Sequence, residues 1–166
     1  MERNILILLF LFCFACKKSS IPYPTNQSCT MPPSPVRFVV LDKNGKNLIS
    51  SKEDLVTISF LENGVEKILT SIIFKIKDSN YDTTTSNKYN GLGVGSELGD
   101  YSVRNTNPIK TFNLNINGKK IGIIYYDLIR TNWEQDCYSE KSYLFNGVDV
   151  KKDKSVRPDV SILQLM

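Results

Sequence analysis

Three of the five Asn-Gly pairs in this chain of 166 residues lie between short apolar runs, and these three constrain its fold more than any other feature. They are Asn63-Gly64, Asn117-Gly118 and Asn146-Gly147. Asn-Gly between two apolar runs is the strongest short-range signal for a β-hairpin. The sequence therefore predicts strands that pair with their neighbours along the chain.

The runs themselves have the composition of strands. Val36 to Leu41 is rich in β-branched and aromatic residues and ends in the turn signal Asp42-Lys43-Asn44-Gly45. Phe112, Leu114 and Ile116 alternate with polar residues, and no window shows the apolar spacing of an amphipathic helix. Seven to nine short strands indicate an all-β sandwich or small barrel. We favour a small antiparallel β-sandwich, immunoglobulin-like or transthyretin-like.

Histidine is absent from the chain. Its absence excludes Ser-His-Asp and Cys-His catalysis and imidazole metal ligands, although carboxylates or a lysine remain available for catalysis. The net charge is +4, and the lysines are scattered, with no basic patch interleaved with aromatic residues. We therefore expect no nucleic-acid partner and no cofactor.

The N-terminal segment indicates export. A polar start containing Arg3 precedes the unbroken apolar run Ile5 to Phe14, and Ala15 stands directly before Cys16. A positive start, a short apolar run and a small residue at the cut describe a secretory signal. The run is shorter than the roughly 20 residues needed to span a bilayer.

Phe12-Cys13-Phe14-Ala15-Cys16 resembles a bacterial lipobox, and the following Lys17-Lys18-Ser19 is similar to lipoproteins of the Bacteroidota. Cys13 and Phe14 depart from the usual Leu and small residue, and the resemblance covers only about the first twenty residues. It implies that Cys16 carries a diacylglyceryl group and an acylated amine. Two or more acyl chains give stable anchoring to a membrane. A plain signal peptide and a buried N-terminal helix are the alternatives.

The chain therefore divides into three parts. Residues 1–15 are the expected lipoprotein signal peptide. Residues 16–35 comprise the lipidated cysteine and a Pro-rich tether, and residues 36–166 form a single β-sandwich domain. Cys13 leaves with the signal and Cys16 is lipidated, so Cys29 and Cys137 remain. In an exported protein we expect these two to form a disulfide, with two buried thiols as the alternative.

Two loop motifs suggest ligands only weakly. Asp78, Asn80 and Asp82 alternate like the start of a calcium loop, but Thr83 and Tyr89 stand where that pattern needs Gly and Glu. A solvated loop is the better interpretation. The glycine-rich run of residues 91–95 lacks the Gly-Lys-Ser/Thr ending of a phosphate loop, so we interpret it as a flexible loop or a strand kink.

The later part of the chain is rich in aromatic residues. Tyr125 and Tyr126 point to opposite faces of a strand, so only one needs to be buried. Trp133 lies in a polar stretch and is the best candidate for an exposed contact with a sugar or a protein. Glu134, Asp136 and Glu140 are close in sequence, but glycosidase carboxylates need defined separations across a cleft, which sequence proximity does not establish.

These features favour a membrane-anchored, non-catalytic lipoprotein of the cell envelope with a binding or structural role. Its expected partners are the membrane, through the lipid anchor, and an envelope protein or a glycan. A glycan-acting enzyme that uses carboxylates and an inhibitor or immunity-type lipoprotein are the alternatives. Lys17 and Lys18 differ from the acidic segment typical of surface-exported lipoproteins. This favours the periplasmic face of the outer membrane over the cell surface.

Overall fold

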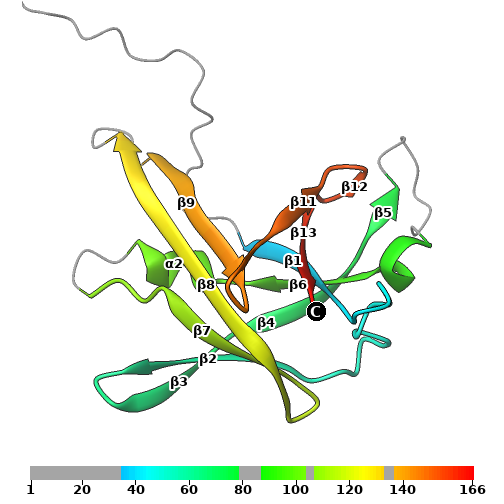
Figure 1. The fold of residues 1–166 in the computed structure, drawn as a ribbon, viewed down its shortest axis with the longest axis horizontal. Coiled ribbons are helices and arrows are strands. Elements are labelled where there is room, and N and C mark those ends of the chain that lie inside the picture. Colours follow the sequence, from blue (N-terminus) through cyan, green and yellow to red (C-terminus); the bar gives the residue numbers. More distant parts are fainter. Residues whose placement is uncertain (1–34, 79–86, 104–106, 133–136) are drawn as a thin grey trace, which may run out of the picture.

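The computed structural model describes residues 35–78, 87–103, 107–132 and 137–166. Two β-sheets enclose the main hydrophobic core (Figure 1), which confirms the predicted all-β, sandwich-like fold. The six-stranded sheet has the order β10-β9-β8-β7-β2-β3. Its strands are β2 (Val56–Glu62), β3 (Val65–Leu69), β7 (Thr111–Ile116), β8 (Lys119–Asn132), β9 (Cys137–Phe145) and β10 (Val148–Asp149).

The second sheet has five strands in the order β11-β13-β1-β6-β4. They are β1 (Val36–Leu41), β4 (Ser71–Lys75), β6 (Leu92–Ser96), β11 (Lys151–Asp153) and β13 (Val160–Gln164). The remaining elements are the paired strands β5 (Lys77–Asp78) and β12 (Val156–Arg157), the 3-10 turn η2 (Lys88–Gly91) and the short helix α2 (Leu98–Ser102).

The three Asn-Gly pairs form the predicted hairpins. They join β2 to β3, β7 to β8 and β9 to β10. The φ angles of Asn63, Asn117 and Asn146 lie between 50° and 53°, and the glycine that follows each of them also has a positive φ. Positive φ at both central residues is the geometry of a type I′ turn, whose twist matches that of the flanking strands. Local turn chemistry thus determines three of the strand pairings.

The two sheets are joined at both edges. β3 continues into β4 through Thr70 alone, and β10 continues into β11 through Val150 alone. Each edge strand of one sheet therefore bends into an edge strand of the other, as at the corners of orthogonally packed sheets. The result is a sandwich in which a chain of paired strands runs around the main core.

Strand β1 is buried on both faces. Phe38 and Val40 face the main core, whereas Val39 and Leu41 belong to a second, smaller core. The other buried members of the second core are Ile76, Val156 and Val160. β1 pairs antiparallel with β6 and parallel with β13, the last strand of the chain. This parallel pair departs from the predicted all-antiparallel arrangement; no hairpin connects the two strands, so local turn chemistry does not set their relative direction.

Residues 92–95 of the glycine-rich run lie in strand β6, and Gly91 ends η2 with a positive φ. Of the two interpretations, a flexible loop or a strand kink, the flexible loop is therefore wrong. Phe74 of β4 lies opposite Gly93, and Ile72 lies opposite Gly95. A Cβ atom on Gly93 would come within 2.7 Å of the Phe74 ring. The glycine therefore leaves room for the ring, which packs against the second core.

We expect Gly93→Ala to lower the free energy of unfolding by about 1–3 kcal/mol, because the added methyl group overlaps the Phe74 ring. Urea unfolding measures the change. Phe74→Leu in the Gly93→Ala background should recover part of the loss. If the double variant instead loses the sum of what Gly93→Ala and Phe74→Leu lose singly, the contact is contradicted.

Candidate functional site

Most residues singled out from the sequence lie outside the described residues. These are Cys16, Cys29, Asn80, Asp82 and Trp133. Asp78 is the last residue of β5, and Cys137 is the first residue of β9. The calcium-loop interpretation and the Trp133 contact therefore stay predictions. In the described part of the chain, no group of three or more Cys, Asp or Glu residues is placed to hold a metal ion.

Cys137 is buried and disulfide-bonded. The other three cysteines of the chain all lie within residues 1–34, outside the described residues. Pairing with Cys29 therefore stays a prediction. The disulfide itself is located at the first residue of β9, in the six-stranded sheet.

Three aromatic residues of β8 and β9 pack inside the main core, namely Tyr126, Tyr143 and Phe145. Tyr126 is buried and its neighbour Tyr125 is half-buried, as the alternation of a strand requires. The rings of Tyr126 and Tyr143 meet edge to face, with centroids 4.9 Å apart. Burial, together with the nearby Glu140 charge, raises the pKa of Tyr126. This tyrosine therefore remains a neutral packing group at physiological pH.

Glu140, the described member of the predicted acidic group, forms an ion pair. Its Oε2 lies 3.0 Å from the Nζ of Lys152, which is on β11. The pair therefore connects an edge strand of the five-stranded sheet to β9 of the six-stranded sheet.

A second polar cluster surrounds Asp153. The Nζ of Lys88 lies 2.7 Å from Oδ2, and the Tyr89 hydroxyl donates a 2.7 Å hydrogen bond to the same oxygen. The backbone N–H and the hydroxyl of Ser155 donate to Oδ1 at 2.8 and 2.7 Å. Burial alone would raise the pKa of Asp153, but the hydrogen bonds from Lys88, Ser155 and Tyr89 outweigh it and hold that pKa far below its usual value.

This cluster holds a strained turn over the second core. Tyr89 and Asn90 have φ angles of 57° and 55°, in the left-handed region that non-glycine residues rarely adopt. The buried side chain of Asn47 holds the turn by donating to the carbonyl oxygens of Tyr89 and Leu92 at 2.7 and 2.9 Å. Strained residues often mark functional sites. Here the contacts made by Asn47 and Asp153 hold the strained turn in place, and Tyr89 of this turn packs against the second core.

A third charged cluster lies on the outer side of β8. The carboxylate of Asp127 is buried, with Lys110 Nζ at 2.9 Å and Lys141 Nζ at 3.6 Å. The hydrogen bond to Asp127 raises the pKa of Lys110. One carboxylate thus faces two ammonium groups, so these three side chains together carry a net positive charge.

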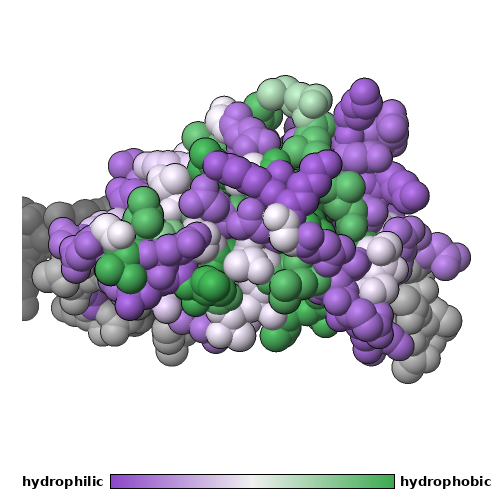
Figure 2. Space-filling model, turned by 90° about the horizontal axis from the view of Figure 1, so that it is seen from below, coloured by the Kyte–Doolittle hydropathy of each residue, from purple (hydrophilic) through white to green (hydrophobic). Residues whose placement is uncertain are grey.

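Three exposed aliphatic side chains lie on consecutive strands, on β2 and β3 of the six-stranded sheet and on β4 of the five-stranded sheet. Leu61, Ile68 and Ile72, here called the apolar strip, are 66%, 70% and 56% exposed. Register places Leu61 and Ile68 on one face of the β2–β3 pair, together with Glu66. Figure 2, which views the molecule from below, shows apolar side chains at the surface among charged ones. Exposed groups of large aliphatic side chains often mark interaction sites.

A depression of about 440 Å³ lies near the other edge of the six-stranded sheet. Its lining includes Phe145, Val148, Ile162 and Leu165, together with the charged residues Lys43, Asp149 and Lys151. Its volume falls within the range of small-ligand pockets, but the groups with shifted pKa values described above lie elsewhere.

Comparison of the chain with protein-family models, curated proteins and solved structures finds no match. Among the described residues, the structure contains no helix with the length and apolar character required to cross a bilayer. The apolar strip and the Asp153 cluster were not singled out from the sequence. Their members lie on separate strands and turns, so no single stretch of the sequence contains either group. The one local hint was strand β3, which is exposed along most of its length.

We expect Asp153→Asn to lower the free energy of unfolding at pH 7 by about 2 kcal/mol, because it weakens hydrogen bonds to a charged group. Since folding lowers the pKa of Asp153, its stabilisation is present above pH 4 and declines as the pH falls below about 4. The difference from the unmodified protein should therefore shrink in acid. Urea unfolding at several pH values tests this, with the exposed Asp149→Asn as the charge-matched control. An equal loss in the two variants would contradict the prediction.

Proposed function

We propose that this protein is a membrane-anchored, non-catalytic lipoprotein of the cell envelope whose β domain binds another envelope protein. The observation that carries the proposal is the apolar run Ile5 to Phe14, which ends at Ala15-Cys16 in front of a β domain. Cys16 is the acceptor for the acyl chains, and the periplasmic face of the outer membrane is the expected location.

The chemistry of the described carboxyl groups supports a non-catalytic role. A glycan hydrolase needs two facing acids, one of them with a raised pKa. Among the described residues, the carboxyl pKa values that shift are those of Glu53, Asp54 and Asp153, and all three are lowered. Asp127 and Glu140 are engaged by lysines.

The apolar strip supports a protein partner over a glycan. Sugar recognition relies on flat aromatic faces with polar groups beside them, whereas Leu61, Ile68 and Ile72 are aliphatic. Aliphatic side chains gain most from burial against other apolar side chains. A glycan partner would instead depend on Trp133.

Metabolic labelling with radioactive palmitate tests the anchor. The unmodified protein should incorporate label, and Cys16→Ala should incorporate none and leave the membrane fraction, because the acyl acceptor is lost. Cys13→Ala is the matched control and should be labelled normally, since Cys13 is removed with the signal. Label retained in Cys16→Ala would contradict the anchor.

A photo-crosslinking amino acid placed at residue 68 tests the binding surface in intact cells. We expect a discrete protein adduct at this position, because Ile68 is the most exposed member of the apolar strip. Val148, which is 44% exposed on the opposite edge strand β10, is the control position. Adduct formation should also fall when Leu61→Ser is introduced. Equal adducts at the two positions would contradict a specific surface.

A further inference from the structure

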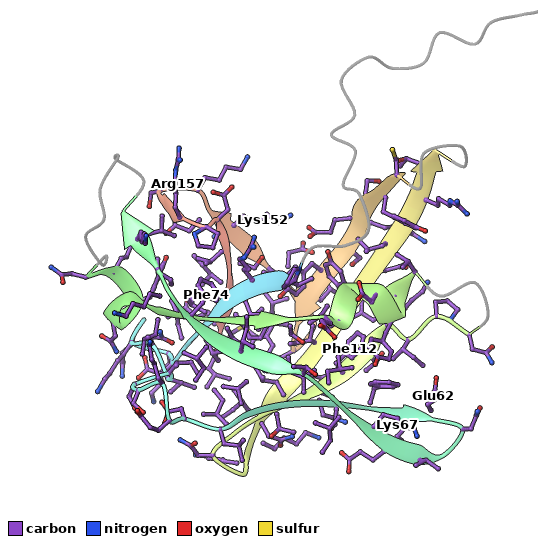
Figure 3. The ribbon with its side chains drawn as sticks, turned by 180° about the vertical axis from the view of Figure 1, so that it is seen from behind. Glu62, Lys67, Phe74, Phe112, Lys152 and Arg157 are labelled. Atoms are coloured by element: carbon purple, nitrogen blue, oxygen red, sulfur yellow. The ribbon has the colours of Figure 1, made fainter. Side chains whose placement is uncertain are left out.

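Strand β3 is an open edge of the six-stranded sheet. It stands at the end of the strand order and, among the described strands, pairs with β2 alone. Figures 1 and 3 show the β2–β3 hairpin, which carries Glu62 and Lys67, at the lower margin of the molecule with β3 outside β2. Figure 2 views the molecule from this side. The free side of β3 therefore lies at the surface of the described part of the chain.

The hairpin determines which backbone groups of β3 face outward. Glu62 and Val65 flank the two-residue turn and lie opposite each other, so they form a hydrogen-bonded pair. Because hydrogen-bonded and non-hydrogen-bonded pairs alternate, Glu66 and Ile68 direct their N–H and C=O groups away from β2. Within the described ranges, no backbone hydrogen bond reaches these four groups. They are available to pair with another strand.

The opposite edge of the same sheet is protected, whereas β3 is not. β10 has only two residues and leads directly into β11, which carries Lys151 and Lys152. Short edge strands and lysines are devices by which natural sheets avoid pairing with other chains. β3 has five residues with a single lysine, Lys67, and its Val65 and Ile68 are 56% and 70% exposed. Such an edge is suited to accept a strand from a partner.

This inference rests on the proposed function and describes how the protein partner binds. We propose that the envelope partner adds an antiparallel β-strand to the free edge of β3, with its main chain bonded to the N–H and C=O groups of Glu66 and Ile68. Strand addition of this kind obtains affinity from main-chain hydrogen bonds and specificity from alternate side chains.

The side chains of β3 define the chemistry of the added strand. Residues opposite each other in an antiparallel pair lie on the same face, and opposite charges there stabilise the pair. The partner strand therefore presents an apolar residue to Ile68, an acidic residue to Lys67 and a basic residue to Glu66. The apolar and basic residues lie on the face that carries Leu61, and the acidic residue lies on the other face.

A second copy of this chain fits the edge poorly. A two-fold axis relates the strands of a symmetric antiparallel pair, so the residue at its centre lies opposite its own copy. Centred on Glu66 or Lys67, the pair opposes like charges, which destabilises it. Centred on Ile68, the pair runs into the bend at Thr70, after which the chain belongs to the other sheet. The occupant is therefore a strand of a different protein.

Proline at residue 66 tests the strand addition in intact cells, with the photo-crosslinking amino acid at residue 68. Glu66→Pro removes an outward N–H and spares the ladder to β2, because Val65 and Lys67 make those bonds. We expect adduct formation to fall about tenfold, since a main-chain hydrogen bond is lost and the ring obstructs the edge. Asp149→Pro is the matched control, because Asp149 holds the same position in the β9–β10 hairpin, and it should leave the adduct unchanged.

Glu66→Lys keeps the N–H and tests the charge assignment. The adduct should fall about threefold, because the basic residue of the partner then faces a like charge. Glu66→Gln is its control and should lower the adduct less. Urea unfolding of each purified variant checks the fold.

The outcomes separate this proposal from the proposed function. An adduct that persists in folded Glu66→Pro would overturn the strand addition but not the protein partner. If Glu66→Pro does not fold, an unchanged adduct in Glu66→Lys would overturn the proposal instead. An adduct between two copies of the chain would overturn the different protein as occupant. The absence of any adduct in the unmodified background would contradict the proposed function as well.

Discussion

The burial of strand β1 on both faces is the constraint on which the rest of this structure depends. A strand that is apolar on both sides must be covered by two layers. The six-stranded sheet supplies one layer across the main core, and side chains from β4, β12, β13 and η2 supply the other. The two corners at Thr70 and Val150 keep the sheets together, because each edge strand continues directly into the opposite sheet.

Polar interactions secure the thinner of these two layers. The second core is small, so apolar contact alone gives it limited stability. Asn47 and Asp153 hold the strained residues Tyr89 and Asn90 over it, and Asp153 gathers hydrogen bonds from residues far apart in the chain. The polar groups of this region thus hold in place a turn with unusual backbone angles.

Two parts of the six-stranded sheet differ in the chemistry of their surfaces. The β2–β3 pair exposes the aliphatic side chains of Leu61 and Ile68. On β8, by contrast, the buried carboxylate of Asp127 lies between the ammonium groups of Lys110 and Lys141. A buried charge of this kind is held by its ion pairs, whereas exposed aliphatic side chains gain stability only when another apolar surface covers them.

The sequence by itself determined the elements whose cause is local. Asn63-Gly64, Asn117-Gly118 and Asn146-Gly147 adopt positive φ at low cost between two apolar runs, so they specify hairpins. The alternation from Phe112 to Ile116 specifies which side chains enter the core. Only the tertiary structure decided the parallel pairing of β1 with β13, the conversion of the glycine-rich run into β6, and the meeting of Tyr89 with Asp153. These features join segments distant in the chain. Their geometry depends on which strand covers which face, and no local signal encodes that.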